Sequence, residues 1–535
     1  MNLPNEDLTL AKLKNLLKDY HSEANTSNPN HMIFLIEREY LQNAIEALYK
    51  KNDIKVLFLT MLAIDERQLD KKYKLHLIFL ILNTNTSVTF KVNLNETKPS
   101  YPAVSKLIPA AEWFEREIHD MFGIVAEEVD LLPLVLHRDF PYGKYFPMRK
   151  DFELNKEVKI SEVPHQFTQP HAEGMHQVAV GPIHAGIIEP GHLRFCTIGE
   201  QILEFNAQLF YTLKGIEKIA EGKTIEEGLV LAEHVCGMCS YSHSTAYCQA
   251  IESIGQINIP KRASYIRTIC LELERLSSHL SDLSAICSAG GFAIASMPAA
   301  RFREKVMQLI FKLVGHRFFR GLNAIGGLNK DINDSGFEFL RKDLRILKKE
   351  LQSLEKMILG SDTLLDRLET TGELNFTQVQ DIGLVGPAAR ASGIDIDLRR
   401  DFKYAAYNDF IPRIPTETEG DALARTKIRI KELYETLDLI PEIIDQLPSG
   451  EVKEVVPKLF PFAFQPGIGI VESAKGSLIH WLILDDKNKI FRWHVRSASF
   501  MNWRGVVQAT KGKNIVPDGP LVNKSFNLCY ACVDR

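Results

Sequence analysis

Residues 266–283 read IRTICLELERLSSHLSDL, and this stretch decides the fold of the larger part of the chain. Its apolar residues recur every three or four positions, the spacing that forms one continuous stripe along an α-helix. A second stretch, LRKDLRILKKELQSLEKMI at 340–358, shows the same spacing. We expect two long helices whose stripes serve bundle packing and nothing more. The stripes are formed by Ile266, Ile269, Leu273, Leu276, Leu280 and Leu283, and by Leu340, Leu344, Leu347, Leu351, Leu354 and Ile358.

Strand patterns flank this helical region on both sides. The N-terminal part predicts strands at HMIFLIE (31–37) and IKVLFLTML (54–62), a helix at YLQNAIEALYKK (40–51), and a hairpin of KLHLIFLIL (74–82) with VTFKVNL (88–94). Near the end, SLIHWLILDD (477–486) and IFRWHVRSASF (490–500) predict a small sheet. The predicted fold class is α+β, with a small N-terminal α+β domain followed by a large, mainly helical bundle that carries a small peripheral β-sheet.

A chain of 535 residues is too long for one ordinary hydrophobic core, so we expect at least two domains. We predict an α+β domain at 1–150, a linker at 151–177 and the bundle domain at 178–535. The linker is polar, with scattered Pro, Gly and His. Its three histidines, His165, His171 and His176, are expected to be solvated, because nothing else in that segment clusters with them.

The composition excludes several classes of function. The chain has 64 basic and 68 acidic residues, a net charge of −4, so it has no electrostatic basis for binding nucleic acid. Its first residues lack a secretory signal, and its longest apolar run, LIFLIL at 77–82, is far short of the roughly 20 residues that span a bilayer. We therefore expect a cytoplasmic protein that reaches the cytoplasmic face of the membrane only through partner subunits.

The eight cysteines include two C-x-x-C pairs, Cys236 with Cys239 and Cys529 with Cys532. Two intervening residues let both sulfurs bind one ion, and four thiolates suit zinc, an iron cluster or nickel. Zinc ribbons keep their pairs about 15 to 20 residues apart, whereas position 529 lies 290 residues beyond position 239. This separation favours a site that the whole domain holds together, which is typical of catalytic sites. The isolated Cys196, Cys248, Cys270 and Cys287 are expected to be buried core residues.

Most of residues 178–535 resemble the catalytic large subunit of nickel-iron hydrogenases, within the membrane-associated branch that includes formate hydrogenlyase. Residues 100–150 resemble the 30 kDa-like subunit of respiratory complex I, and the C-terminal domain also resembles its 49 kDa-like subunit. The matching stretches are GPIHAGIIEPGHLRF (181–195), CGMCSYSHSTAY (236–247), ERLSSHL (274–280), GGLNKD (326–331), GPAARASG (386–393), FRWHVRSASFMNW (491–503) and CYACVDR (529–535), with SYPAVSKLIPAAEWFEREIHDMFGI (100–124) and FPMRKDF (146–152) in the N-terminal part.

The resemblance implies a nickel ion bound by Cys236, Cys239, Cys529 and Cys532. It implies that Cys239 and Cys532 bridge nickel to an iron that carries carbon monoxide and cyanide. The sequence departs from the family pattern at two positions, with His234 before the first pair where Arg is usual and Leu528 before the second where Pro is usual.

Three further residues receive roles from the same matches. Glu189, in EPGH, would pass protons to and from a terminal cysteine, with an exposed loop acid as the alternative. His243 would donate a hydrogen bond to a bridging sulfur. Arg390 would place its guanidinium over the open side of the site, with a structural salt bridge as the alternative.

The implied activity is reversible reduction of protons to H2. The implied partners are a small subunit with a [4Fe-4S] cluster, ferredoxin-like iron-sulfur subunits and antiporter-like membrane subunits, with formate dehydrogenase as a further candidate and maturation factors that insert nickel. The [4Fe-4S] clusters belong to the partners and not to this chain. One competing hypothesis is a complex I-like subunit that shapes a quinone pocket without nickel. Another is a scaffold with structural zinc.

Overall fold

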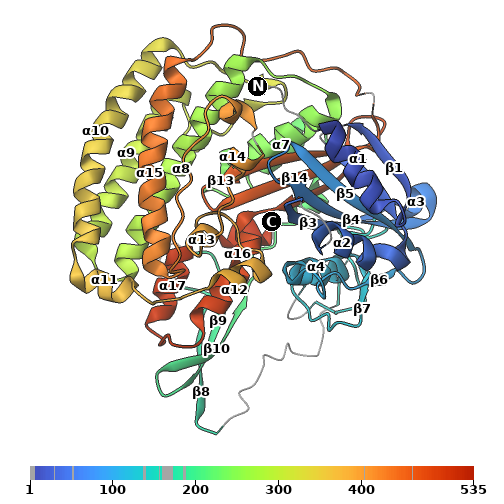
Figure 1. The fold of residues 1–535 in the computed structure, drawn as a ribbon, viewed down its shortest axis with the longest axis horizontal. Helices are drawn as coiled ribbons and strands as arrows, with labels where there is room; N and C mark the ends of the chain where they lie inside the picture. Colours follow the sequence, from blue (N-terminus) through green and yellow to red (C-terminus); the bar gives the residue numbers. More distant parts are fainter. Residues whose placement is uncertain are drawn as a thin grey trace. The chain divides into compact units, whose positions relative to one another are not determined.

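The computed structural model divides the chain into two units, Met1–Gln169 and Pro170–Arg535, each with its own core (Figure 1). It describes residues 6–28, 31–50, 54–136, 140–155, 157–159, 173–184, 188–402, 404–460 and 462–535. Two of the three predicted linker histidines, His165 and His171, lie outside the described residues, and His176 lies in a strand.

The first unit is built on a five-stranded sheet with the strand order β1-β2-β5-β4-β3. Strands β2 and β5 run parallel, and the other neighbouring pairs are antiparallel. The strands are β1 His21–Asn28, β2 His31–Ile36, β3 Val56–Asp65, β4 Lys72–Ile81 and β5 Thr86–Asn95. The α-helices are α1 Glu6–Leu17, α2 Leu41–Lys50, α3 Arg67–Asp70 and α4 Glu112–Phe122, and two further short strands are β6 Ser100–Pro102 and β7 Val125–Glu127.

Apolar pairs across the strands form the core of this sheet. Phe79 lies opposite Val88, and the ring of Phe79 packs against Phe90 at 5.1 Å between centroids. Helix α4 covers β3, where Phe114 meets Phe58 edge to face. The four strands and the helix predicted for residues 31–94 are confirmed. Strand β1 was missed because its sequence, HSEANTSN, has no apolar alternation.

Long helices dominate the second unit, and four of them, α8, α9, α10 and α15, run side by side in Figure 1. Both predicted helices are confirmed and every stripe residue is buried. The long helices are α7 Ser240–Gly255, α8 Lys261–Ala289, α9 Ala293–Val314, α10 Asp334–Leu359 and α15 Ala422–Asp445. Shorter ones are α5 Ile216–Ala220, α6 Ile225–Glu233, α11 Asp362–Leu368, α12 Phe376–Ile382, α13 Gly386–Arg390, α14 Leu398–Asp401, α16 Ala498–Thr510, α17 Asp518–Phe526 and α18 Tyr530–Asp534.

Helix α8 does more than pack through its stripe, because its polar residues are also buried and join a cluster of ion pairs. Arg275 of α8 forms an ion pair with Glu432 of α15, and Asp282 of α8 forms one with Arg429 of α15 at 2.8 Å. This buried ion cluster consists of the cations Arg275, Arg390, Arg399, Arg429 and Lys475 and the anions Glu272, Asp282, Asp397, Glu432 and Glu472, with His279 between them.

Three small sheets complete the second unit. The C-terminal sheet has the antiparallel order β13-β14-β15, formed by β13 Pro466–Ser473, β14 Gly476–Leu484 and β15 Ile490–Arg496. The others are β8 Met175–Val180 with β9 His192–Ile198 and β10 Gln201–Gln208, and the pair β11 Asn323–Ala324 with β12 Gly327–Leu328. The predicted strand over 490–500 was too long, because Ser497 caps α16 by accepting a hydrogen bond from Phe500 N at 3.2 Å.

Helix α7 lies directly on strand β13, and two glycines permit this close contact. A Cβ atom on Gly469 would lie 1.7 Å from the carbonyl oxygen of Ala246, and one on Gly467 would lie 2.1 Å from that of Ala250. The two glycines are two residues apart and therefore share one face of the strand. This packing fixes the height of α7 above the sheet.

No helix among the described residues is both long enough and apolar enough to cross a membrane.

Candidate metal centre

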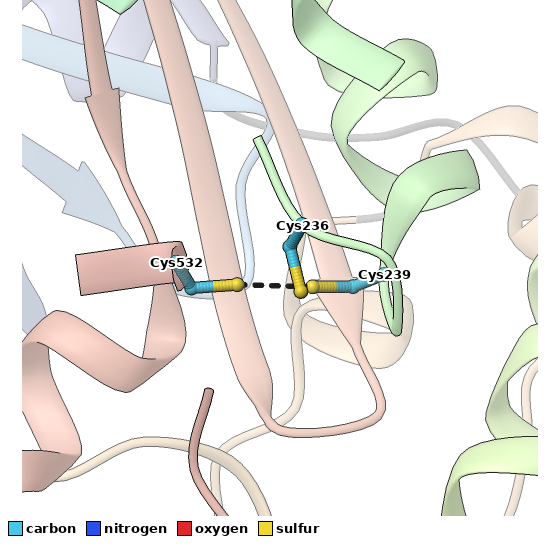
Figure 2. Close-up of side chains that lie close together, drawn as sticks. All are labelled: Cys236, Cys239 and Cys532. Carbon is cyan, nitrogen blue, oxygen red and sulfur yellow. Dashed lines mark hydrogen bonds between the residues drawn. The ribbon is translucent and has the colours of Figure 1, made fainter. Parts of the chain in front are cut away.

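The two thiol pairs meet although they are far apart in the sequence. The sulfurs of Cys236, Cys239 and Cys532 all lie within 4.8 Å of one another, and the Sγ atoms of Cys239 and Cys532 are 3.3 Å apart (Figure 2). These three side chains are buried, and the partly buried Cys529 packs against them. The structure brings the sulfurs of three of the four predicted ligands together and places Cys529 against them. The four isolated cysteines are buried, as expected.

The first pair occupies the turn between α6 and α7. Met238 N donates to Cys236 Sγ at 3.3 Å, so the backbone of the turn faces the sulfur. Cys239 is the N-cap residue of α7 but its side chain caps nothing. Glu274 of α8 supplies the cap instead, because its carboxylate accepts hydrogen bonds from Tyr241 N at 2.7 Å and Ser242 N at 3.0 Å. Helix α8 therefore fixes the end of α7 that carries Cys239.

The second pair lies in a tail that is buried along its last residues. Asp534 accepts hydrogen bonds from Phe210 N at 2.8 Å and Thr212 N at 2.9 Å. The carbonyl oxygen of Arg535 accepts hydrogen bonds from Lys214 N and Gly215 N. The guanidinium of Arg535 forms an ion pair with Glu217. The hydroxyl of Ser497 donates to the carbonyl of Cys532 at 2.8 Å. The tail is thus anchored at Cys532 and at the residues after it.

Each of the two departures from the family pattern fits its local surroundings. His234 ends α6, and its Nδ1 lies 2.7 Å from the carbonyl oxygen of Val230, the partner to which the ring donates. Leu528 is buried beside the second pair.

Glu189 contacts the tail between its two cysteines. Its Oε2 accepts a hydrogen bond from Ala531 N at 2.6 Å. Gly191 permits this approach, because a Cβ there would lie 2.3 Å from the ring of Tyr530. Burial of the tail-facing side raises the pKa of Glu189 above its ordinary value, while the other side remains exposed. Glu189 is therefore an exposed loop residue that also contacts the tail.

His243 lies behind Cys532, with its Nε2 atom 3.7 Å from the sulfur. Its Nδ1 atom lies 2.9 Å from Nε2 of His480 on β14. Burial lowers the pKa of His243 to about 4 and lowers that of His480 well below its usual value, so burial favours the neutral form of each ring.

Arg390 lies in the buried ion cluster of α8, α15 and β13. Its Nη1 pairs with Asp397 at 3.1 Å and Glu472 at 3.4 Å, and its Nη2 pairs with Glu432. These contacts favour the structural salt bridge, which was the alternative to a role over the metal site.

Three residues near the site were missed from sequence. His480 appeared only as one residue of a predicted strand, and Glu274 only within the ERLSSHL stretch. Lys475 lies in a hairpin turn that resembles an exposed one, yet it is buried and pairs with Asp282. Asp282 also accepts a hydrogen bond from Asn527 in the tail at 2.6 Å. Only the packing of distant segments reveals these contacts.

The cluster fits a soft metal by its chemistry. Its donors are four thiols, and thiolates bind nickel, zinc and iron in preference to hard cations. Hydrogen bonds from Cys239, Cys529 and Cys532 hold the pKa of Cys236 well below its usual value, so one thiolate forms readily. The pKa of Cys239 is raised by its contact with Cys236, and that of Cys532 by burial. Protons on these two sulfurs must leave when a metal binds.

Three family models match consecutive parts of the chain. The model of the 30 Kd subunit of respiratory-chain NADH dehydrogenase matches residues 34–158, and that of its 49 Kd subunit matches 290–466 and 463–535. The model of nickel-dependent hydrogenases matches 214–285, which includes the first thiol pair and His243. Formate hydrogenlyase subunit 5 of Escherichia coli (strain K12) is 34% identical, covering 94% of this chain and 88% of the relative.

The chain belongs to the family of group 4 hydrogenase large subunits. Hydrogenase-4 component G of Escherichia coli (strain K12), also in this family, is 32% identical over 98% of this chain and 92% of its own length. Among solved structures, a chain of the membrane-bound sulfane sulfur reductase, an archaeal respiratory membrane complex, superimposes with a TM-score of 0.65 at 27% identity. That match covers 69% of this hydrogenase-family chain and 100% of the other. The predicted family, with fused 30 kDa-like and 49 kDa-like regions, is confirmed.

Proposed function

We propose that this chain is the catalytic subunit of a nickel-iron hydrogenase that reduces protons to H2 reversibly. The observation that carries the proposal is the thiol cluster, which unites both C-x-x-C pairs and lies beside a carboxylate. Three of its sulfurs lie within 4.8 Å of one another, and Cys529 completes a set of four. The structural-zinc scaffold explains neither the contact of Glu189 with the tail nor the family membership.

Cys236, Cys239, Cys529 and Cys532 would hold nickel, and Cys239 with Cys532 would share an iron that carries carbon monoxide and cyanide. The 3.3 Å between the two proposed bridging sulfurs supports this division of ligands. When bound, the metal pair supplies the redox chemistry that combines two protons and two electrons into H2. The protein contributes a rigid and largely buried ligand set, since α7 and the tail are each fixed by several hydrogen bonds.

Glu189 would carry protons between solvent and the thiols. One side of its side chain is exposed, and its Oε2 lies 2.6 Å from a tail amide between Cys529 and Cys532. A carboxyl group whose pKa is raised exchanges protons closer to neutral pH than an ordinary acid does. The buried His243 would hold its proton on the side of Cys532, where it stabilises negative charge on sulfur.

We propose that electrons arrive through a small subunit with a [4Fe-4S] cluster and through ferredoxin-like subunits. Antiporter-like membrane subunits would hold the complex on the cytoplasmic face of the membrane. Two of the similar proteins support such an assembly, since one is named a formate hydrogenlyase subunit and another is part of a membrane complex. The first of these makes formate dehydrogenase a candidate electron donor, and maturation factors would insert the nickel.

The competing function is a complex I-like subunit that shapes a quinone pocket without nickel. Its support is the match of both ends of the chain to NADH dehydrogenase subunits. The thiol cluster argues against it, because a quinone pocket needs no four converging sulfurs.

The deciding experiment measures nickel, iron and zinc in the complex purified without oxygen from cells that have the maturation machinery. We expect about one nickel per chain, as a single four-thiolate site requires. Zinc in its place, or no nickel, would overturn the proposal in favour of a structural site or a quinone-pocket subunit.

A pair of variants locates the metal. Cys532→Ser removes a proposed bridging sulfur and is expected to abolish H2 production. Cys196→Ser is the matched control, since this thiol is equally buried but lies on β9 outside the cluster. Undiminished H2 production by Cys532→Ser would end the assignment.

A further inference from the structure

A row of three buried rings extends from the metal centre into the C-terminal sheet. His243 of α7 is next to Cys532, His480 of β14 follows, and Trp493 of β15 ends the row. All three are completely buried. The indole Nε1 of Trp493 lies 3.2 Å from Nδ1 of His480, and Nε2 of His480 lies 2.9 Å from Nδ1 of His243.

The sheet and helix α7 fix the geometry of this row. Trp493 lies opposite Leu482, so it is the diagonal neighbour of His480 on the same face of the sheet. Helix α7 brings His243 to that face because it lies on β13 through Gly467 and Gly469. Tyr247, which packs against both His480 and Trp493, uses its hydroxyl elsewhere, donating to the carbonyl of Ile225 at 2.9 Å.

The chemistry of tryptophan decides where the protons lie. An indole nitrogen always donates a hydrogen bond and never accepts one, whereas a neutral imidazole has one nitrogen of each kind. Nδ1 of His480 must therefore accept, which places the proton of that ring on Nε2. Nε2 of His480 donates to Nδ1 of His243, so the proton of His243 lies on its Nε2, which faces the sulfur of Cys532.

We propose that Trp493 is a positioning residue that sets the tautomers of His480 and His243 and thereby makes His243 present an N–H, rather than a lone pair, to Cys532. The importance of this for catalysis rests on the proposed function, whereas the tautomers themselves do not. An N–H directed at a thiolate stabilises its negative charge, but a lone pair repels it. The row therefore adjusts the electron density on one metal ligand from two residues away.

The first test reads the tautomers directly, without metal. The purified protein is labelled with ¹⁵N-histidine, and the His243→Gln and His480→Gln variants assign the two rings by their missing signals. We expect protonated Nε2 and unprotonated Nδ1 in both rings of the wild type. A proton on Nδ1 of either ring in the wild type would overturn the proposal. The two variants serve only to assign the wild-type signals.

The second test removes the indole N–H. Trp493→Phe keeps an aromatic ring but no donor, so we expect signals from both tautomers of His480. Trp481→Phe is the control, since this buried tryptophan of the same sheet lies opposite His494 instead. His480→Gln retains one acceptor and one donor and should keep the Nε2 proton of His243, whereas His480→Leu should lose it. Unchanged tautomers in Trp493→Phe would refute the role of the indole.

The consequence for the metal is measured in the complete complex. We expect Trp493→Phe to retain nickel, to lose roughly 10-fold or more of its H2 production, and to show a more negative midpoint potential of the nickel signal. An unchanged potential would contradict the proposed effect on Cys532. A wild type without nickel would end the proposed function, while the tautomer measurement would still decide the present inference.

Discussion

Substituting Gly469 by alanine should move helix α7 and thereby disturb the metal centre through His243, which this helix carries. The new Cβ would lie 1.7 Å from the carbonyl oxygen of Ala246, and such contacts are essentially never closer than 3.0 Å. Helix α7 must therefore retreat by at least 1.3 Å, the difference between these two distances. The obstructing atom belongs to the backbone and cannot rotate away.

Two effects should follow from this displacement. Overpacking of this kind costs about 1–3 kcal/mol, and we expect about 2 kcal/mol, which lowers the melting temperature of the unit by roughly 4 °C. The displacement also adds to the 2.9 Å between His243 and His480 and breaks that hydrogen bond. Calorimetry of the purified protein measures the first effect, and nickel content with H2 production measures the second.

Gly255→Ala is the matched control on the same helix. Its Cβ would meet only the movable side-chain tips of Ile257 and Phe460, at 3.0 to 3.2 Å. Because alanine is a better helix former than glycine by about 1 kcal/mol, we expect no loss of stability. A Gly469→Ala variant that melts like the wild type and retains full activity would refute the claim that this contact sets the height of α7.

Three further predictions concern charged groups. Glu189→Gln keeps an acceptor for Ala531 N but cannot release a proton, so H2 production should fall by at least about 100-fold at unchanged nickel content; near-normal turnover would remove Glu189 from the proton path. Arg390→Met removes one of the buried cations that pair with Glu432 and Asp397 and should cost about 3–5 kcal/mol of unfolding free energy. A variant of normal stability but without activity would instead support a role at the metal. Acid should also destabilise the second unit through Asp397. Burial alone would raise the pKa of Asp397, but the charges of Arg399 and Arg390 lower it to about 2. Lowering the pKa from its ordinary value of 3.8 corresponds to about 2 kcal/mol of unfolding free energy. This stabilisation is present above about pH 4 and is lost as the pH falls to about 2. Asp397→Asn should therefore flatten the pH dependence of the melting temperature in that range.

The sequence predicted elements well where burial follows a regular period. The apolar stripes of α8 and α10, the alternation in β2 and the continuous apolar runs of β3 and β4 each reflect which faces are buried, and all of these elements were found. Strand β1 has no such alternation, because it is polar and lies at the edge of its sheet. The start of α16 was read as strand because Ser497 acts as a cap through its hydroxyl, which a pattern of apolar residues does not register.

In the candidate site, the thiols could be predicted because C-x-x-C spacing indicates metal ligands, wherever the two pairs lie along the chain. Glu189 and His243 came from the resemblance of their surrounding motifs, and their proposed roles remain predictions. His480 and Trp493 could not be found in this way. Their significance depends on the strand register of β14 and β15 and on the height of α7, which are properties of tertiary packing.

The distance along the chain between the two thiol pairs has a consequence for how the protein folds. Cys239 and Cys532 are 293 residues apart, and closing a loop of that length costs about 5 kcal/mol of chain entropy. The metal cannot nucleate folding as zinc does in a small finger, since its ligands meet only after the helices and the C-terminal sheet have assembled. Docking of the tail is thus expected to be a late step, and the interval before it is when the first thiol pair would be accessible to the proposed nickel-inserting factors.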